Sequence, residues 1–339
     1  MAVSKILGIL EIAGFIGAQF TNSLLLYLLY MKSDRRFKKF KHLMAVFAVF
    51  DMIYSWIEVV LTPVMHIKGP GMIAFVDSFL KYDRWIANDL ITLYCALFAT
   101  CISLLALQFG YRYIAVCRPH QLDSYFSGYK FILMFIPSII LTIIWFLIEK
   151  YLSNPTPAKE AFFKSDFHKY YNENISELSF VAVNYKFEET NGQWKWNWDE
   201  MIGAIGCDII MFVCFQFILF CGVKTYRKMT NVSKSMSKKT KELNKQLFLT
   251  LVLQTLLPTI TMYAPVGLLF TLPIFEIEVG FLANQVGVCL GIYPALDPLV
   301  PILLIKDFRR TVLCRKREGY QVTDSRLQSA TVGSVSAPE

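Results

Sequence analysis

The fold class of this chain is decided by the apolar run FILMFIPSIILTIIWFLI, residues 131–148. None of its eighteen side chains is charged, and a helix needs about 20 apolar residues to cross the ~30 Å hydrocarbon core of a bilayer. The composition agrees, since only 18% of the 339 residues are charged against ~25% in an average soluble domain. The sequence therefore predicts an all-α membrane protein.

Six further stretches meet or approach that length, and no Lys or Arg occurs in any of the seven. The six are residues 6–31, 42–66, 86–111, 200–223, 246–272 and 281–305. The apolar run 72–80 is shorter and is bounded by Pro70 and Lys81, so we expect it to be interfacial or re-entrant. We predict a seven-transmembrane helix bundle within residues 1–317.

Basic residues predict which way the bundle faces. The loops after spans 1, 3 and 5 and the tail after span 7 hold six, three, eight and seven Lys or Arg residues, 24 of the chain's 34. Positive charge gathers on the cytoplasmic side, so we expect the N-terminus outside and the C-terminus inside. Span 1 has no small-residue cleavage site, so we expect an uncleaved anchor.

Two glycosylation acceptors fall on opposite sides of this arrangement. Asn174-Ile175-Ser176 lies in the long second outer loop, where glycosylation is possible. Asn231-Val232-Ser233 matches the same pattern but lies inside, so we expect it to stay unmodified.

The second outer loop, residues 149–199, is the one region in which we expect strands. Polar and apolar residues alternate over 180–190 and again over 193–199. Asn191-Gly192 between them is a strong two-residue hairpin turn. The sequence therefore predicts a β-hairpin in this loop.

That turn would pair Glu188 with Lys195 and Phe187 with Trp196. One face of the hairpin would then carry five aromatic side chains: Tyr185, Phe187, Trp194, Trp196 and Trp198. The hairpin either rests on the helix ends or forms a lid over a ligand pocket, and both can hold.

The eight cysteines predict no outer disulfide, because none lies in an outer loop. Cys314 follows span 7 within an expected interfacial helix at 306–317. It is a candidate for palmitoylation, and an unmodified thiol is an equal alternative. Residues 318–339 are predicted to form a disordered cytoplasmic tail, rich in Ser and Thr, that can be phosphorylated.

Ionisable groups inside spans are costly and indicate function. They are Glu11, Asp51, Glu58, Asp89, Asp208 and Asp297. For Asp51 and Asp297 we favour a polar core that sets helix packing. Asp89 and Asp208 lie in the outer thirds of spans 3 and 5, where ligand contact and polar contact at the helix end are equal alternatives.

Two features on the inner side suggest conformational change. Pro258 and Pro265 each remove a hydrogen bond from span 6, so this helix is predicted to be kinked and can act as a hinge. Gln108 and Arg112 share a face at the inner end of span 3. Arg112 either extends to the headgroups or forms a two-state contact where a cytoplasmic partner binds.

Several classes of protein lack support in the sequence. No span contains a lysine for a retinal Schiff base, and there is no ring of charges typical of an ion filter. Zinc-ligand spacings, nucleophile elbows and phosphate-binding glycine loops are missing from the cytoplasmic segments. We expect no enzyme, no cofactor, no metal site and no nucleic-acid partner.

Four long runs resemble the nematode serpentine chemoreceptors of the Str class, which are G-protein-coupled receptors. These runs, about a quarter of the chain, are HLMAVFAVFDMIYSWIEVVLTPVMHI (42–67), YCALFATCISLLALQFGYRYIAVCRP (94–119), KQLFLTLVLQTLLPTITMYAPVG (245–267) and YPALDPLVPILLIKDFRR (293–310). Rhodopsin-like receptors differ: they usually have an acid before the arginine of Tyr111-Arg112-Tyr113, and Asn-Pro in place of Asp297-Pro298.

The resemblance implies a chemosensory receptor in the ciliary membrane of a sensory neuron, where it signals through a heterotrimeric G protein. A small odorant or pheromone would enter the outer half of the bundle. Its candidate contacts, chosen by depth and polarity, are Asp89, Tyr94, Asp208, Tyr263 and Asn284. Binding would make span 6 pivot near Pro258, and arrestin or a receptor kinase would act on the tail.

Two rival classes share seven spans. A ligand-gated cation channel of the insect odorant-receptor type has its N-terminus inside, which the distribution of basic residues disfavours. A membrane carrier would need an ion site near the bilayer midplane, for which Asp51, Glu58 and Asp297 are the only candidates.

Overall fold

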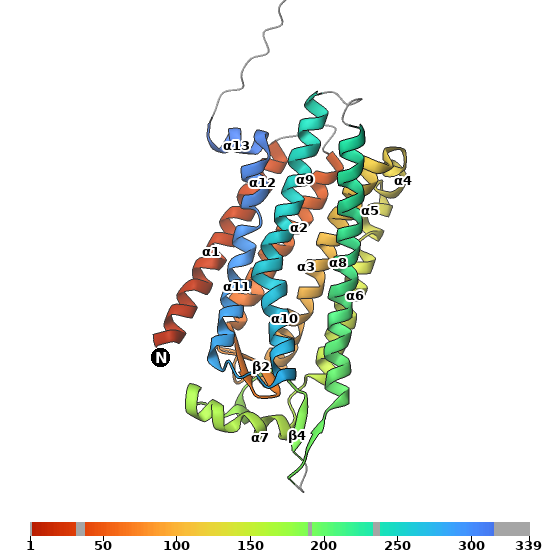
Figure 1. Cartoon of the computed structure of the whole chain (residues 1–339). Coiled ribbons are helices and arrows are strands. Elements are labelled where there is room, and N and C mark those ends of the chain that lie inside the picture. The colour runs from red at the N-terminus through yellow and green to blue at the C-terminus, as the bar shows by residue number, and fades with distance from the viewer. Residues whose placement is uncertain (1, 32–37, 189–191, 233–237, 315–339) are drawn as a thin grey trace, which may run out of the picture.

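Seven membrane-spanning segments run side by side in the computed structural model, which describes residues 2–31, 38–188, 192–232 and 238–314 (Figure 1). Six of these segments are long and apolar enough to cross a bilayer, and the seventh, Phe281–Leu296, is shorter. The predicted seven-transmembrane bundle is confirmed. The N-terminal end of the first helix and the loops 62–83 and 153–197 lie at one end, which we call the outer end.

Five spans have one long helix each, and the last two are interrupted near a proline. In the fourth span a turn separates the long helix from the short α5 (Tyr129–Leu133). The long helices of the first five spans are α1 (Ala2–Met31), α2 (Lys38–Leu61), α3 (Arg84–Cys117), α6 (Ile136–Leu152) and α8 (Trp198–Val232). Span 6 consists of α9 (Lys238–Pro258), a π-helix (Thr259–Tyr263) and α10 (Ala264–Thr271), and span 7 of α11 (Asn284–Leu296) and α12 (Leu299–Leu304). Several helices extend past their predicted ends, because hydropathy marks the part in lipid while backbone hydrogen bonds continue through polar residues.

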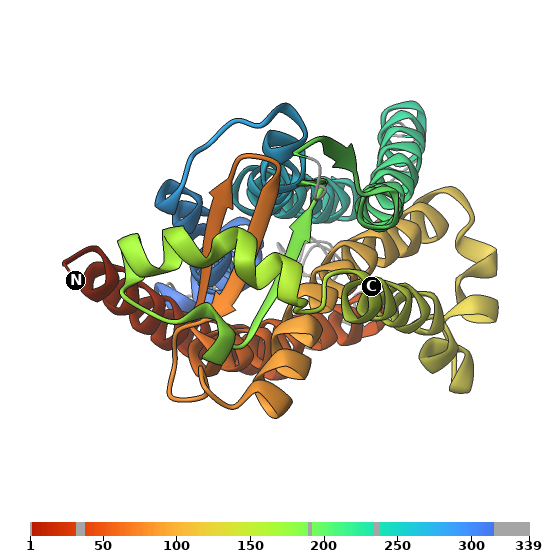
Figure 2. The same ribbon diagram turned by 90° about the horizontal axis from the view of Figure 1, so that it is seen from below.

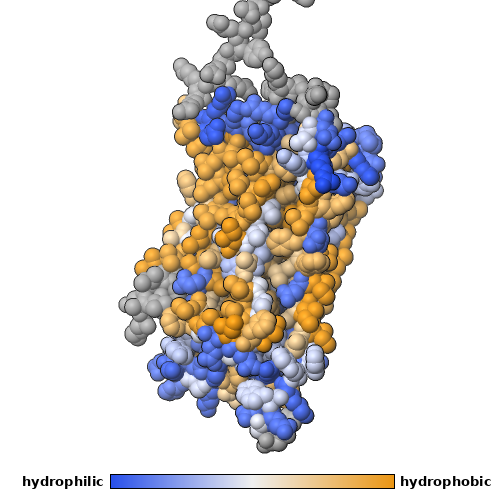
Figure 3. All heavy atoms as spheres, viewed as in Figure 1, coloured by the Kyte–Doolittle hydropathy of each residue, from blue (hydrophilic) through white to orange (hydrophobic). Residues whose placement is uncertain are grey.

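The face of the bundle seen in Figure 3 is mostly hydrophobic between two hydrophilic ends. On α6 the side chains of Ile139, Ile143 and Leu147 are exposed, at a spacing that places them on one face of the helix. Exposed apolar side chains are stable against lipid, so this face is consistent with a membrane-facing surface.

Proline explains both interrupted spans. Pro258 ends α9, and the π-helix after it widens the turn where the proline removes a hydrogen bond. In span 7, Pro298 has no N–H to donate to the carbonyl oxygen of Pro294, four residues earlier. The side-chain amide of Asn22 in α1 donates to that oxygen instead, at 2.9 Å.

A three-stranded antiparallel sheet, which we call the outer sheet, lies across the outer end of the bundle (Figure 2). Its strands are β1 (Pro63–Lys68), β2 (Gly71–Val76) and β3 (Phe180–Asn184). Side chains alternate between its faces: Ala74 and Val183 join the bundle core, whereas Ile73 and Phe75 pack beneath α7 (Pro157–Asp166). The outer sheet therefore closes the bundle from outside.

The outer sheet corrects two expectations. Residues 63–66, expected in span 2, belong to β1. Residues 72–76 of the run 72–80 belong to β2 at the outer end, and the expected interfacial position of this run stays a prediction. The strand expected over 180–190 is divided between two sheets. Because the outer sheet is buried on both faces, its strands are nearly continuously apolar and resemble the end of a membrane span.

The hairpin in the second outer loop is present, but its predicted register is wrong by one residue. β4 (Lys186–Glu188) pairs with β5 (Trp194–Trp196), with Glu188 opposite Trp194 and Phe187 opposite Lys195. A two-residue turn at Asn191-Gly192 would require Glu188 opposite Lys195. Residues 189–191 lie outside the described part of the chain. The shift places Phe187 on the face opposite Trp194 and Trp196, so the five aromatic side chains do not share a face.

Short helices complete both ends. At the outer end α7 continues into a π-helix (Phe167–Tyr171) and a 3₁₀ turn (Ile175–Glu177), and two 3₁₀ turns (Leu272–Phe275 and Phe281–Ala283) join α10 to α11. At the inner end lie a 3₁₀ turn (Pro119–Gln121), α4 (Leu122–Tyr125), α5 (Tyr129–Leu133) and α13 (Lys306–Val312). Phe308 anchors α13 in the bundle, and Cys314 just after it is exposed. The predicted tail lies outside the described residues.

Candidate ligand-binding site

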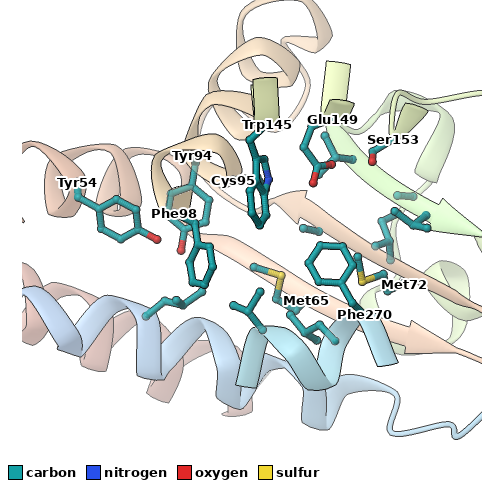
Figure 4. A pocket seen from close by; sticks show the side chains of 18 residues that line it. Tyr54, Met65, Met72, Tyr94, Cys95, Phe98, Trp145, Glu149, Ser153 and Phe270 are labelled. Atoms are coloured by element: carbon teal, nitrogen blue, oxygen red, sulfur yellow. The ribbon is translucent and has the colours of Figure 1, made fainter. Parts of the chain in front are cut away.

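A cavity of about 80 Å³ lies between the outer sheet and the helices beneath it, and we call it the outer cavity (Figure 4). One water molecule needs ~10–15 Å³ measured in this way, so the cavity has room for a small molecule. Ten lining residues come from the helices: Tyr54, Tyr94, Cys95, Phe98, Trp145, Glu149, Val266, Leu269, Phe270 and Leu290. The others are Ser153 and seven residues of the outer sheet: Met65, Met72, Ile73, Ala74, Val181, Ala182 and Val183.

The outer sheet is fixed over this cavity by hydrogen bonds along both edges. At the β1 edge, Gly280 N donates to Ile67 O at 3.1 Å. At the β3 edge, Ala182 N donates to Ser153 O at 2.8 Å, and Phe180 N donates to the side chain of Asn88 in α3 at 2.9 Å. Both edges are thus paired, and the cavity is covered by ordered backbone.

The polar groups of the cavity gather at one end. The carboxylate of Glu149 and the hydroxyl of Ser153 lie near each other, next to the indole of Trp145 (Figure 4). Glu149 is 5% exposed, although it is only one turn from the outer end of α6. The remaining wall is almost entirely aromatic or aliphatic.

Tyr94 is the one predicted ligand contact that lines the outer cavity. Its hydroxyl donates to Glu58 Oε2 at 3.1 Å, and its ring stacks on that of Tyr54 at 5.2 Å between centroids. Because the hydroxyl is already bonded, Tyr94 offers the cavity mainly its ring.

Two other predicted contacts support the lining without joining it. Asn284 Oδ1 accepts a hydrogen bond from Met65 N at 2.7 Å and so positions a lining residue. Tyr263 packs edge-to-face on Phe98 at 5.2 Å, and its hydroxyl lies 3.8 Å from Cys101 Sγ.

The two acidic candidates lie elsewhere. Asp89 forms an ion pair with Lys150, and both side chains are partly exposed. Asp208 is exposed on the surface of α8. The structure therefore does not bring Asp89 and Asp208 together with Tyr94 at the cavity.

Glu149 is the cavity residue that the sequence could have indicated. The sequence predicts that span 4 ends at residue 148, which places Glu149 in the loop and outside the ionisable groups in the membrane. The helix continues to Leu152. The sequence does not indicate Met65 or Met72 as cavity residues, because it predicts no strand at either position.

A second group of polar residues joins α7 to the outer sheet. His66 Nε2 lies 3.2 Å from Asp166 Oδ2, and His66 Nδ1 lies 3.2 Å from the hydroxyl of Tyr171. Burial lowers the pKa of His66 below 6.5, and burial raises the pKa of Tyr171 to about 12. The pKa of Asp166 is lowered: partial burial opposes this, but hydrogen bonds from Lys68 and His66 outweigh it.

At the inner end, Arg112 links α3 to α9. Its Nη2 donates to both the backbone oxygen and Oδ1 of Asn244 at 3.3 Å, and its guanidinium lies 5.8 Å from the ring centre of Phe40. Gln108, one turn earlier, is buried, and its Oε1 has no hydrogen-bond partner among the described residues.

A buried polar core lies between these two ends. Gln254 Nε2 in α9 donates to Asp297 Oδ2 at 2.9 Å, one turn before Pro258. Asp51 is 1% exposed, and within the described part of the chain its oxygens have no hydrogen-bond partner. Across residues 2–31, 38–188, 192–232 and 238–314, no group of three or more His, Cys, Asp or Glu side chains is arranged to hold a metal ion.

Comparison with known proteins identifies the family to which the chain is similar. The family model described as "Serpentine type 7TM GPCR chemoreceptor Str" matches residues 7–313. The chain is 34% identical to "Serpentine receptor class r-10" of Caenorhabditis briggsae over 306 residues, which cover 89% of this chain and 88% of that protein. "G-protein coupled receptor str-33" of Caenorhabditis elegans is 26% identical, with 87% and 86% covered.

Proposed function

Because the chain belongs to the Str family of serpentine seven-transmembrane chemoreceptors, we propose that it binds a small odorant or pheromone in the outer cavity and activates a heterotrimeric G protein at its inner end. The observation that carries this proposal is the outer cavity itself. It lies at the depth that a ligand from outside reaches, and it is enclosed by an ordered sheet. Pockets of this kind, apolar with a few polar groups, are the usual sites of small-molecule binding.

Two contacts of span 6 with α3, one toward each end, support coupling between the two ends. The cavity residue Phe98 packs on Tyr263 of the π-helix, directly after Pro258. At the other end of the same span, Asn244 contacts Arg112 of α3. We infer that a ligand displaces Phe98, that span 6 pivots at its π-helix, and that the Arg112–Asn244 contact opens. A ligand produces this only through a difference in its affinity for the two arrangements.

The remaining assignments follow from the family and the sequence. The chain is a multi-pass membrane protein, and we place it in the ciliary membrane of a chemosensory neuron. Asn174 is exposed at the outer end and is the proposed glycosylation site, and exposed Cys314 is the proposed palmitoylation site. The tail, outside the described residues, would be the substrate of a receptor kinase and would then bind arrestin. We propose no catalytic activity.

The proposal is tested by measuring calcium or cAMP in cells that express the chain, with and without a co-expressed Gα subunit, against a panel of volatile and water-soluble small molecules. We expect a response that requires Gα. A ligand-gated current that persists without Gα would refute the receptor and favour the channel.

Ala74 allows a test of the cavity. Its side chain lines the cavity from β2 and is 9% exposed. Ala74→Leu adds volume inside the cavity and should lower ligand potency by about tenfold or more, because the larger side chain occupies space that the ligand needs. Ala74→Ser keeps the size and is the matched control. Equal potency in both variants, at equal surface expression, would place the ligand elsewhere.

A further inference from the structure

Among the described residues that line the outer cavity, only Glu149 has a carboxylate or a basic side chain. Glu149 belongs to α6 and is only 5% exposed. Its side chain lines the cavity together with that of Ser153 (Figure 4). A carboxylate in such a place requires a compensating charge or hydrogen bonds, because an unpaired buried ion costs several kcal/mol.

The cations nearest to Glu149 are bound to other groups. Lys150, the next residue, pairs with Asp89. Lys159 of α7 lies 3.3 Å from Glu200 Oε1, and it also donates to the carbonyl oxygens of Leu152 at 2.8 Å and Asn154 at 3.1 Å.

Lys159 forms an ion pair with one of its two neighbouring glutamates. Glu149 and Glu200 both interact electrostatically with Lys159, but only Glu200 is within ion-pair distance. Among the described residues, none forms an ion pair with Glu149. The residues beside Glu149 at the polar end of the cavity, Ser153 and Trp145, are neutral donors, so a cation bound there would have Glu149 as its charged partner.

The other walls of the cavity are suited to a cation. The rings of Trp145 and Phe98 lie 5.6 Å apart between centroids, and Phe270 and Tyr94 add two further rings. Aromatic faces attract ammonium groups, most strongly where water is excluded. The thioethers of Met65 and Met72 and the small residues of the outer sheet leave an apolar space for the body of the ligand.

We propose that the outer cavity recognises a small organic ammonium compound, whose cation pairs with Glu149 among the aromatic rings and whose short apolar body lies against the outer sheet. This inference rests on the proposed function, since it names the chemical class of the ligand for the same site. It also predicts that carboxylic acids are rejected, because their charge is the same as that of Glu149.

The test uses the purified full-length chain in lipid nanodiscs and matched probes of one shape. Propylamine, isobutylamine and cyclohexylamine are compared with the corresponding alcohols and carboxylic acids, and affinity is measured from the concentration dependence of the melting temperature. We expect the affinity of the amines to be at least about tenfold higher than that of the alcohols, because one ion pair is added in a site without water. We expect the acids not to bind.

Glu149→Gln should lower amine affinity by about tenfold or more and leave alcohol affinity unchanged, since a cation–carboxylate pair is lost. Glu188→Gln, an exposed glutamate of β4, is the matched control and should keep the wild-type preference. Glu149→Asp retains the charge and should still bind amines more tightly than alcohols. This variant shows that the effect of Glu149→Gln is not caused by loss of folding.

Equal binding of amines and alcohols, an unchanged preference in Glu149→Gln, or no binding of any amine would overturn the inference. The proposed function fails on a different measurement. If neutral compounds give a Gα-dependent response while amines do not bind, the proposed receptor function is supported and the proposed ammonium ligand is refuted. If responses do not require Gα, the receptor itself falls.

Discussion

Asn22 shows how one side chain determines whether a broken helix is tolerated in a membrane. Its side-chain amide donates a hydrogen bond to the carbonyl oxygen of Pro294. That oxygen has no donor within the helix, because Pro298 lacks an N–H. We predict that Asn22→Ala lowers the free energy of unfolding by about 1–3 kcal/mol, the cost of an unsatisfied buried carbonyl. The measurement is the melting temperature of the purified protein.

The matched control for this prediction is the next residue. Ser23 lies on the exposed side of α1, so Ser23→Ala should leave the melting temperature unchanged. Equal melting temperatures for Asn22→Ala and the wild type would show that the Pro294 carbonyl finds another donor.

Asn244 permits a second prediction for a single residue. Asn244→Ala removes the Oδ1 acceptor of Arg112 and keeps the backbone acceptor. We expect ligand-independent, Gα-dependent signalling to rise by up to about tenfold, since a hydrogen bond to a charged group contributes about 1.5 kcal/mol to the closed arrangement. Leu249→Ala, on the exposed face of the same helix, is the control. A fall in basal signalling would mean that Arg112–Asn244 supports the active arrangement instead.

Helix packing depends on one close approach between α1 and α11. A Cβ added at Gly14 would lie 2.6 Å from the backbone oxygen of Gly291, nearer than any real Cβ contact. We predict that Gly14→Ala destabilises the fold by about 1–3 kcal/mol through forced separation of the two helices. Gly8→Ala on the same helix meets nothing within 4 Å and should be neutral or stabilising. Similar melting temperatures for the two variants would contradict this packing.

The docking of α7 on the outer sheet should depend on pH. The groups that face His66 are Asp166, Tyr171, Lys68 and Glu278, and burial is the largest cause of its lowered pKa. An undocked His66 binds protons below about pH 6.5 more readily than a docked one. Its contribution to docking is therefore complete above that pH and declines as the pH falls from 6.5 toward the lowered pKa.

Hydrogen–deuterium exchange of α7 measures this dependence. After correction for intrinsic exchange rates, protection of residues 157–171 should fall by at most ~10-fold per pH unit below pH ~6.5, the limit for one proton. His66→Gln should remove the dependence on pH. A dependence that persists in His66→Gln would assign it to another group.

The sheet and its neighbours also show what periodicity can and cannot reveal. The six long spans are recognisable because each contains an apolar window of 18 residues with at most two charged side chains, close to the length that crosses a bilayer. β1 and β2 are buried on both faces, so they lack the alternation of polar and apolar residues that distinguishes a strand. Residues 63–66 are therefore indistinguishable in sequence from a continuation of span 2. The predicted hairpin register assumes a two-residue turn, and the dipeptide Asn191-Gly192 alone does not determine the length of the turn.

For the whole molecule, the two glycosylation acceptors test the orientation. Asn174 lies at the outer end, and Asn231 is exposed at the opposite end of α8. We predict that a glycosidase increases the gel mobility of the wild type and of Asn231→Gln, but not of Asn174→Gln. The reverse pattern would invert the topology of every span.

The site was less predictable than the fold. Depth and polarity selected Tyr94, which lines the outer cavity, and also Asp89, which pairs with a neighbouring lysine at the helix end. Most cavity residues are apolar, and an apolar residue that lines a cavity cannot be distinguished in sequence from one that faces lipid or core. Contacts between distant segments, such as Asn284 with Met65, are visible only in the folded chain.

The outer sheet has an evolutionary consequence. It supplies seven of the eighteen residues that line the cavity, yet none of its strands has to enter the membrane. Membrane insertion of the spans therefore places no demand on Ala74 or Val183, which face the cavity and the outer part of the bundle core. After gene duplication, copies of such a chain can diverge at these positions and change what they detect, while the bundle that every copy inherits stays intact.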